Sequence, residues 1–228
     1  HELFGNPPYF HIGCDEGGAP GCPKCRAQDW PETVGRHIAN VSGFLKARSA
    51  RCLMWHDMLL SGSDERFSKL DGYPVNGATR AGCEKLLSLI PKDVIVCDWY
   101  YGGKRNTFPT WEYFKGQGRD VVPSSWMKPV GTVSMGVNAV KSELFGFMGT
   151  SWHRAYGETL KHIYLPAAYA AWGCAEAYAA YCPNFSPIWR RTGWDMKLSE
   201  EDDAGYSFDD IPARAHSRPG GMQMWEAE

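Results

Sequence analysis

The stretch VIVCDW, residues Val94–Trp99, is the clearest β-strand in the chain. It is a continuous apolar run that follows Pro91 and precedes Gly102 and Gly103, and proline and glycine are typical boundaries of a strand. A run that is apolar throughout is typical of a strand that is buried on both faces of a parallel sheet. This stretch therefore predicts a parallel sheet that is covered by helices.

Strand-like and helix-like segments alternate on both sides of this stretch, and such alternation indicates βα units and a parallel sheet. We expect five strands, at Tyr9–Gly13, Arg51–Trp55, Val94–Trp99, Asp120–Val122 and Leu144–Met148. Apolar spacing and proline positions predict helices at Pro31–Ala50, Ala81–Ile90, Thr110–Gly116, Val137–Ser142 and Leu160–Tyr181.

The number of units bears on the architecture. A closed eightfold barrel has eight strand–helix units and typically ~250 residues, whereas the 228 residues here carry five units. We expect the second part of such a barrel, because residue 1 is His rather than Met and the sequence therefore looks like a piece of a longer chain. The alternative is a smaller open sheet that is complete as it stands. The barrel part would span residues 1–183, and residues 184–228 would form a C-terminal extension.

Composition excludes several classes of function. The formal net charge is −2, from 24 Lys and Arg against 26 Asp and Glu, which argues against binding to a nucleic-acid backbone. No apolar run reaches the ~18 residues of a membrane span. Eight cysteines in 228 residues are too few for a disulfide scaffold and favour a reducing compartment, although the localisation is otherwise open.

Aromatic and acidic residues follow every predicted strand, and the carboxyl ends of parallel strands are where active sites lie in such folds. A ring of aromatic side chains around carboxylates suits a sugar, whose ring faces are apolar and whose rim carries hydroxyls. A single tryptophan at a strand end is more often a packing residue, and a single Asp is often a helix cap. The argument therefore rests on the occurrence of such residues after all five predicted strands. The residues are His11, Asp15, Glu16, Trp55, His56, Asp57, Asp98, Trp99, Tyr100, Tyr101, Trp126, Trp152, His153 and Arg154.

Side chains alternate along a strand, so these residues fall into two sets. Trp55 shares a side with Asp57, and Trp99 shares a side with Tyr101. His56, Asp98 and Tyr100 take the opposite sides of their strands. The sequence leaves open which set faces the cleft.

The segment YFHIGCDE, residues 9–16, resembles the His-x-Gly-x-Asp-Glu signature of glycoside hydrolase family 20, the β-N-acetylhexosaminidases. The later strand ends agree in order and kind, and Trp55-His56-Asp57-Met58 is similar to the hexosaminidase D-type branch. The resemblance spans roughly residues 9–180 and implies an α/β fold of the (β/α)8 TIM-barrel type, with strands four to eight in this chain.

The resemblance also implies roles for the acidic pair. Glu16 would be the general acid that protonates the glycosidic oxygen and later activates water. Asp15 would hold the acetamido N–H of the substrate, whose acetamido oxygen is the nucleophile in this substrate-assisted family. Glu16 should be protonated at rest, which requires an apolar wall or the nearby Asp15 charge to raise its pKa.

The remaining site residues would bind the sugar. The resemblance implies that Tyr100 or Tyr101 donates to the acetamido oxygen, and that His11 supports the strand or tunes Glu16. Arg154 stands where many family members carry a Glu that binds sugar hydroxyls, which leaves gluco or galacto preference open. The expected walls and contacts are Trp55, Asp57, Asp98, Trp99, Trp126 and Trp152. No cofactor and no metal is implied.

Three rival hypotheses remain. Cys22-Pro23-Lys24-Cys25 is a Cys-x-x-Cys that, with Cys14 and His11 nearby, could bind zinc or be redox-active. A barrel that binds N-acetylhexosamines without cleaving them is the second, although such a barrel has no need of Glu16. The third is an inactive fragment, whose open barrel edges would favour a dimer or pairing with a missing upstream segment.

Overall fold

Five strands form one parallel sheet in which each strand pairs with the next along the chain. The computed structural model describes residues 2–17, 22–70, 72–103, 105–126, 128–152, 164 and 166–172. The strands are β1 Tyr9–His11, β2 Arg51–Trp55, β3 Ile95–Trp99, β4 Val121–Ser125 and β5 Met148–Gly149. The predicted parallel sheet is thus confirmed for the described part of the chain.

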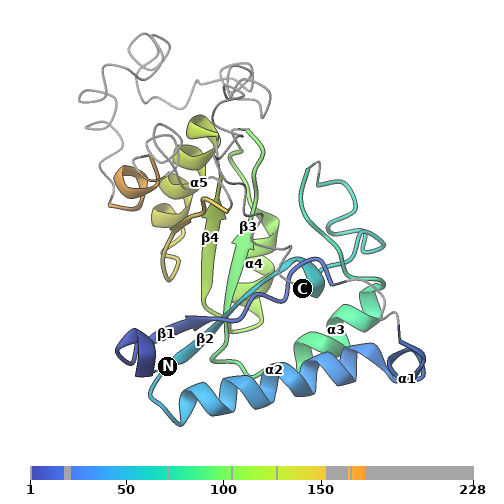
Figure 1. Cartoon of the computed structure of the whole chain (residues 1–228). Helices are drawn as coiled ribbons and strands as arrows, with labels where there is room; N and C mark the ends of the chain where they lie inside the picture. Colours follow the sequence, from blue (N-terminus) through green and yellow to red (C-terminus); the bar gives the residue numbers. More distant parts are fainter. Residues whose placement is uncertain are drawn as a thin grey trace, which may run out of the picture.

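Helices follow the strands and pack on one face of the sheet (Figure 1). The helices are α1 Pro23–Arg26, α2 Trp30–Lys46, α3 Arg80–Leu89, α4 Pro109–Gly116 and α5 Pro129–Lys141, with short 3-10 turns η1 Glu2–Phe4 and η2 Asp57–Leu59. The chain is therefore mixed α/β, with the helices outside and a curled sheet inside.

The curl of the sheet brings its two edges together. The rings of Tyr9, in β1, and Phe145, which precedes β5, have centroids 5.7 Å apart. In a flat sheet these strands would lie four strand spacings of ~4.8 Å apart. The sheet is a half-barrel, compatible with part of an α/β barrel.

The inner and outer faces of the half-barrel carry different clusters. On the inner face, Leu53, Trp55, Ile95, Cys97 and Val122 pack together. Their neighbours along the same strands, Met54 and Val96, belong to the larger core beneath the helices. The set that contains Trp55 and Trp99 therefore faces the barrel interior, which answers the question that the alternation left open.

The amino ends of the strands are joined by one side chain. Arg51, the first residue of β2, donates from Nη2 to Asp120 Oδ2 at 2.7 Å and from Nε and Nη2 to the carbonyl of Asp93. Its guanidinium also lies over the ring of Phe145, 5.0 Å from the centroid. The starts of four strands thus meet at Arg51, at the end of the sheet opposite to the candidate site.

The helix boundaries follow from local chemistry. Asp29 caps α2 by accepting a hydrogen bond from the N–H of Glu32, and Pro31 occupies the first turn. Thr79 caps α3 in the same way through the N–H of Gly82. A Cβ on Gly35 of α2 would lie 2.7 Å from the Cβ of Leu89, so this glycine allows α2 and α3 to approach closely.

Several elements differ from the sequence prediction in their bounds, among them α5, β4 and β5. Helix α5 begins at Pro129, eight residues before the predicted start at Val137, because Gly131, Ser134 and Gly136 interrupt the apolar pattern while lying on its buried side. Strand β4 continues through Pro123 to Ser125, and β5 is confined to Met148–Gly149. Arg154 and the predicted extension at 184–228 lie outside the described residues. Of the helix predicted at Leu160–Tyr181, the structure describes residues 164 and 166–172.

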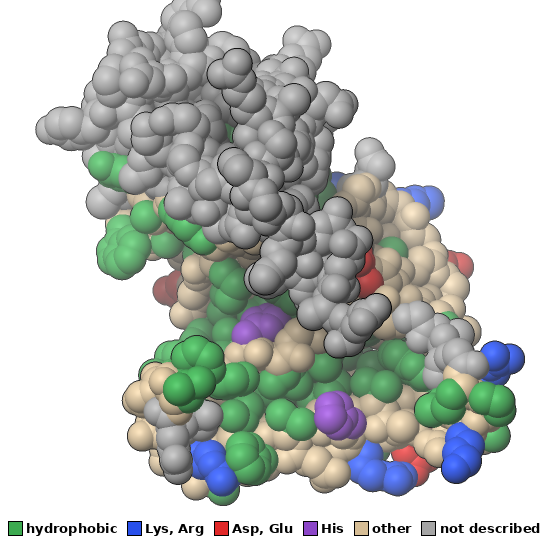
Figure 2. Space-filling model, viewed as in Figure 1, with side chains coloured by type: hydrophobic (Ala, Val, Ile, Leu, Met, Phe, Trp, Pro, Cys, Tyr) green, Lys and Arg blue, Asp and Glu red, His purple; other side chains and the backbone are tan. Residues whose placement is uncertain are grey.

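Within the described part, β1 is an edge strand that pairs with β2 alone. Hydrophobic side chains gather over β1 and β2 on the face that Figure 2 shows. Tyr9 of β1 and Leu3 and Phe4 of η1 are exposed. In the part of the chain that the structure describes, no helix combines the length and apolar character that crossing a bilayer requires.

Candidate active site

Aromatic side chains from all five strands meet at the carboxyl end of the half-barrel. His11 of β1 packs against Trp55 of β2, with ring centroids 4.4 Å apart. Trp55 in turn lies 5.5 Å from Trp152, which follows β5. These contacts close the ring across the interior, from the first strand to the last.

The other half of the ring comes from β3 and β4. Trp99 stacks on Tyr101 at 4.8 Å, and Tyr101 meets Trp126 edge-on at 5.4 Å. The indole N–H of Trp152 donates to the hydroxyl oxygen of Tyr101 at 3.0 Å, which joins the two halves. The structure thus brings together six of the predicted residues: His11, Trp55, Trp99, Tyr101, Trp126 and Trp152.

The loop after β1 carries the acidic pair in an unusual backbone conformation. Gly13, Cys14 and Glu16 all have positive φ, at 74°, 70° and 49°. Non-glycine residues rarely adopt this region, and such strain is concentrated at functional sites. Trp152, on the other side of the ring, also has a positive φ, of 47°.

Asp57 fixes this loop to the aromatic ring. It is completely buried, and its Oδ2 accepts hydrogen bonds from the backbone N–H of Glu16 at 2.8 Å and from Asn76 Nδ2 at 2.9 Å. Its Oδ1 accepts from the indole N–H of Trp99 at 3.3 Å. Asp57 is therefore a positioning residue: three donors hold its carboxylate, and it sets the place of Glu16 and Trp99.

Burial and charge alter the acid–base properties of the site. Burial raises the pKa of Asp15; the hydrogen bond from its own backbone N–H opposes this in part, and the negative charge of Asp57 adds a smaller increase. Burial also raises the pKa of Tyr101. Tyr101 accepts a hydrogen bond from the indole N–H of Trp152 and also hydrogen-bonds with Thr150, and its hydroxyl stays protonated at neutral pH.

Two of the predicted binding residues lie elsewhere. Asp98 is completely buried on the outer face of the sheet and accepts a hydrogen bond of 2.5 Å from the hydroxyl of Tyr73. Tyr100 stacks on the ring of Tyr73, with centroids 5.1 Å apart. Both residues belong to the core beneath the helices, and of the two candidate tyrosines only Tyr101 reaches the site.

The sequence interpretation missed Asn76, which holds Asp57 from 19 positions away. The dipeptide Asn76-Gly77 is a recognisable turn signal, but nothing in the sequence connects it with Asp57.

His56 is completely buried, and its Nδ1 accepts a hydrogen bond from the backbone N–H of Trp99. It therefore supports the end of β3 from the outer face of the sheet.

The Cys-x-x-Cys pair lies apart from the ring. Cys22 and Cys25 are exposed, with sulfur atoms 2.8 Å apart, and Cys22 caps the short helix α1. Over the described residues, no group of three or more His, Cys, Asp or Glu side chains is arranged to hold a metal ion. The described part of the chain thus offers this pair no further ligand.

Comparison of the chain with protein-family models gave no match, and a search of curated proteins found no significantly similar sequence. The functional assignment therefore rests on the residues and geometry of the site.

The acid stability of the chain should depend on His11. Burial lowers the pKa of His11 to about 4 from an ordinary value of 6.5. Its Nδ1 accepts the N–H of Gly13, so the neutral ring carries its proton on the buried Nε2. The unfolded chain binds the proton more tightly, and His11 therefore lowers the free energy of unfolding as the pH falls from 6.5 towards 4.

The His11→Asn variant keeps an acceptor for Gly13 and removes this titration. We expect urea unfolding midpoints at pH 7.5 and 4.5 to differ less in this variant than in the wild type. The exposed His37 provides the control, since His37→Asn should leave the wild-type difference unchanged. Equal pH dependence in the wild type and His11→Asn would contradict the buried, neutral state of His11.

Proposed function

We propose that the chain is the catalytic part of an exo-acting β-N-acetylhexosaminidase, which removes terminal β-linked N-acetylhexosamine with retention of configuration. The observation that carries the proposal is the convergence of aromatic rings from five strand ends beside the Asp15–Glu16 pair. Aromatic walls suit the apolar face of a pyranose, and the adjacent carboxylates supply an acid and a polar anchor. The family 20 resemblance of residues 9–16 points to the same chemistry.

In the proposed mechanism Glu16 protonates the leaving-group oxygen and then activates water. The acetamido oxygen of the substrate attacks the anomeric carbon, as in the substrate-assisted exceptions to the two-carboxylate scheme. Asp15 binds the acetamido N–H and stabilises the positive charge that develops on it. Its raised pKa is consistent with a carboxyl group in a partly dry site that gains a hydrogen-bond donor when substrate arrives.

The walls of the site have distinct roles in this proposal. Trp55, Trp99, Trp126 and Trp152 enclose the acetamido group and the sugar face. The hydroxyl of Tyr101 donates to the acetamido oxygen and aligns it for attack, as its retained proton allows. The half-barrel would correspond to strands four to eight of a (β/α)8 barrel, which is the finer fold assignment that the resemblance implies.

The test is hydrolysis of 4-nitrophenyl N-acetyl-β-glucosaminide and N-acetyl-β-galactosaminide, whose rate ratio gives the sugar preference. Substrate assistance predicts that a 2-trifluoroacetamido analogue reacts more slowly, since fluorine withdraws electrons from the attacking oxygen, and that the 2-hydroxy analogue is not cleaved. Equal rates for the acetamido and 2-hydroxy substrates would contradict the mechanism. Binding of N-acetylglucosamine without any hydrolysis would favour the non-catalytic alternative.

A further inference from the structure

A cavity of about 310 Å³ lies next to the loop that carries Glu16. We propose that this cavity is the subsite for the leaving group, and that it selects substrates whose N-acetylhexosamine is linked to an apolar alcohol. The inference rests on the proposed function and adds the class of aglycone to it. The cavity is lined chiefly by Gly17, Trp30, Pro31, Met58, Ala78 and Cys83, with Asn76 and Thr79 at its polar points.

The position of the cavity follows from the hydrogen bonds of Asp57. One oxygen of its carboxylate binds Trp99, which is part of the aromatic ring, and the other binds Glu16 and Asn76, which lines the cavity. Gly17, the residue after Glu16, is itself part of the cavity wall. Asp57 thus joins the aromatic ring to the cavity, and the Glu16 loop borders both.

This arrangement suits an acid that acts on a bridging oxygen. The oxygen that Glu16 protonates lies between the sugar and the leaving group, so the two parts of the substrate extend in different directions from Glu16. The aromatic ring suits the sugar. The cavity beyond Asp57 is then the place for the group that leaves.

The lining of the cavity determines the chemistry of that group. None of its described lining residues is charged. The amide of Asn76 is already bound to Asp57, and the hydroxyl oxygen of Thr79 accepts the N–H of Gly82. A second sugar would find few partners for its hydroxyls here, whereas an alkyl or aryl group would bury its surface against Trp30, Met58 and Pro31.

The walls of the cavity are held in place before any ligand binds. The backbone N–H groups of Asn76 and Gly77 donate to the carbonyls of Asp57 and Leu60 at 2.9 and 2.8 Å. A Cβ on Gly77 would lie 2.2 Å from the sulfur of Cys83, so only glycine allows the loop to pack here. A preformed pocket of this kind binds a ligand at a low cost in conformational entropy.

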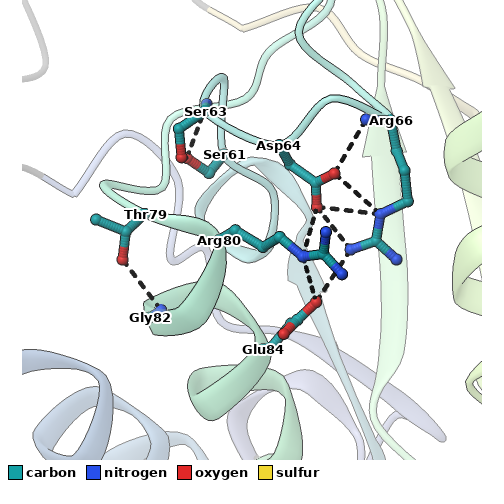
Figure 3. A network of polar contacts seen from close by, with 8 residues as sticks. All are labelled: Ser61, Ser63, Asp64, Arg66, Thr79, Arg80, Gly82 and Glu84. Atoms are coloured by element: carbon teal, nitrogen blue, oxygen red, sulfur yellow. Dashed lines mark hydrogen bonds and ion pairs between the residues drawn. The ribbon is translucent and has the colours of Figure 1, made fainter.

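An ion-pair network links the segment before α3 to α3 itself (Figure 3). Arg66 forms an ion pair with Asp64, with a shortest N–O distance of 2.6 Å. Glu84 of α3 forms ion pairs with both Arg66 and Arg80, at 3.1 and 2.9 Å. The cap formed by Thr79 on α3 lies in the same view. These contacts fix the first turn of α3, which carries Thr79, Gly82 and Cys83 of the cavity wall.

The test is a series of alkyl N-acetyl-β-hexosaminides with methyl, n-butyl and n-hexyl groups. Each methylene that is fully buried contributes ~0.8 kcal/mol, so kcat/KM should rise about fourfold per methylene until the cavity is full. An N-acetylhexosaminide of glycerol, which is similar in length to a short alkyl chain but polar, should gain nothing over the methyl compound.

A substitution that fills the cavity locates the effect. Ala78 is exposed in the free chain, so Ala78→Trp should fold normally and place an indole in the cavity. We expect it to remove the dependence of kcat/KM on the length of the alkyl chain. Ala27→Trp, at an exposed alanine outside the cavity, is the matched control and should keep the wild-type series.

The outcomes separate the two proposals. Hydrolysis of the methyl compound with no gain from longer chains would overturn the apolar subsite and leave the proposed function intact. A gain that persists in Ala78→Trp would overturn the location of the subsite. No hydrolysis of any glycoside, including the 4-nitrophenyl compounds, would overturn the proposed function, and the subsite would fall with it.

Discussion

Replacement of Glu16 by Gln should lower kcat/KM for alkyl N-acetylhexosaminides by ~10²–10⁴-fold, the usual contribution of a general acid. The loss should be much smaller for 2,4-dinitrophenyl glycosides, because a good leaving group departs without a proton. The fold should survive, since the Glu16 side chain is exposed and its structural contact with Asp57 is made by the backbone N–H. Steady-state kinetics on both substrate types measure this difference.

Glu143 offers a matched control for this substitution. It is also an exposed glutamate with a positive φ, of 51°, but it lies in the turn after α5, away from the carboxyl ends of the strands. Glu143→Gln should therefore leave both rates unchanged. An equal loss for alkyl and dinitrophenyl substrates in Glu16→Gln would show that Glu16 does not donate the proton to the leaving group.

Replacement of Asp57 by Asn should reduce both stability and activity. The carboxylate accepts three hydrogen bonds in a site closed to solvent, and an amide group offers one acceptor and one donor in its place. At least one of the N–H groups of Glu16, Asn76 and Trp99 would then face another donor. A buried polar group left without its partner costs ~1–3 kcal/mol, and we expect the free energy of unfolding to fall by this amount.

The same change should lower kcat/KM by about 10²-fold, because a displacement of roughly 1 Å in a reacting group has an effect of that size. Urea denaturation and steady-state kinetics on one preparation measure both quantities. Asp93→Asn provides the control: Asp93 forms a surface ion pair with Lys46, and such pairs contribute about 0–1 kcal/mol. Wild-type activity in Asp57→Asn would contradict the positioning role of Asp57.

The sequence predicted the architecture well where apolar runs are unbroken. Arg51–Trp55 is a strand with the predicted bounds, and the Val94–Trp99 prediction differs from β3 by one residue. The prediction was weakest at α5, whose buried side carries glycine and serine. A Cβ on Gly136 would lie 2.5 Å from the Cβ of Ala170, so this side is small because another segment packs against it, and a contact so distant in sequence leaves no periodic apolar signal.

The candidate site was predictable up to the choice between the two faces of each strand. The alternation separated Trp99 and Tyr101 from Asp98 and Tyr100, but only the helix packing determines which pair lies inside. The partners of Asp57 were beyond prediction, since they combine the loop after β1, the strand β3 and a turn before α3. Hydrogen bonds between such distant segments depend on the tertiary fold.

The contacts of Arg51 have a consequence for how this chain can be altered. Arg51 and Trp55 stand at opposite ends of the same strand, one joining the strand starts and the other facing the ring of aromatic side chains. Substitutions around Arg51, Asp120 and Phe145 can therefore be screened for heat tolerance in one mutant library, and those around Trp55 and Trp152 for altered selectivity in the proposed glycosidase reaction in another. Hits from the two libraries should combine additively, because sites more than ~10 Å apart with no shared partners usually do.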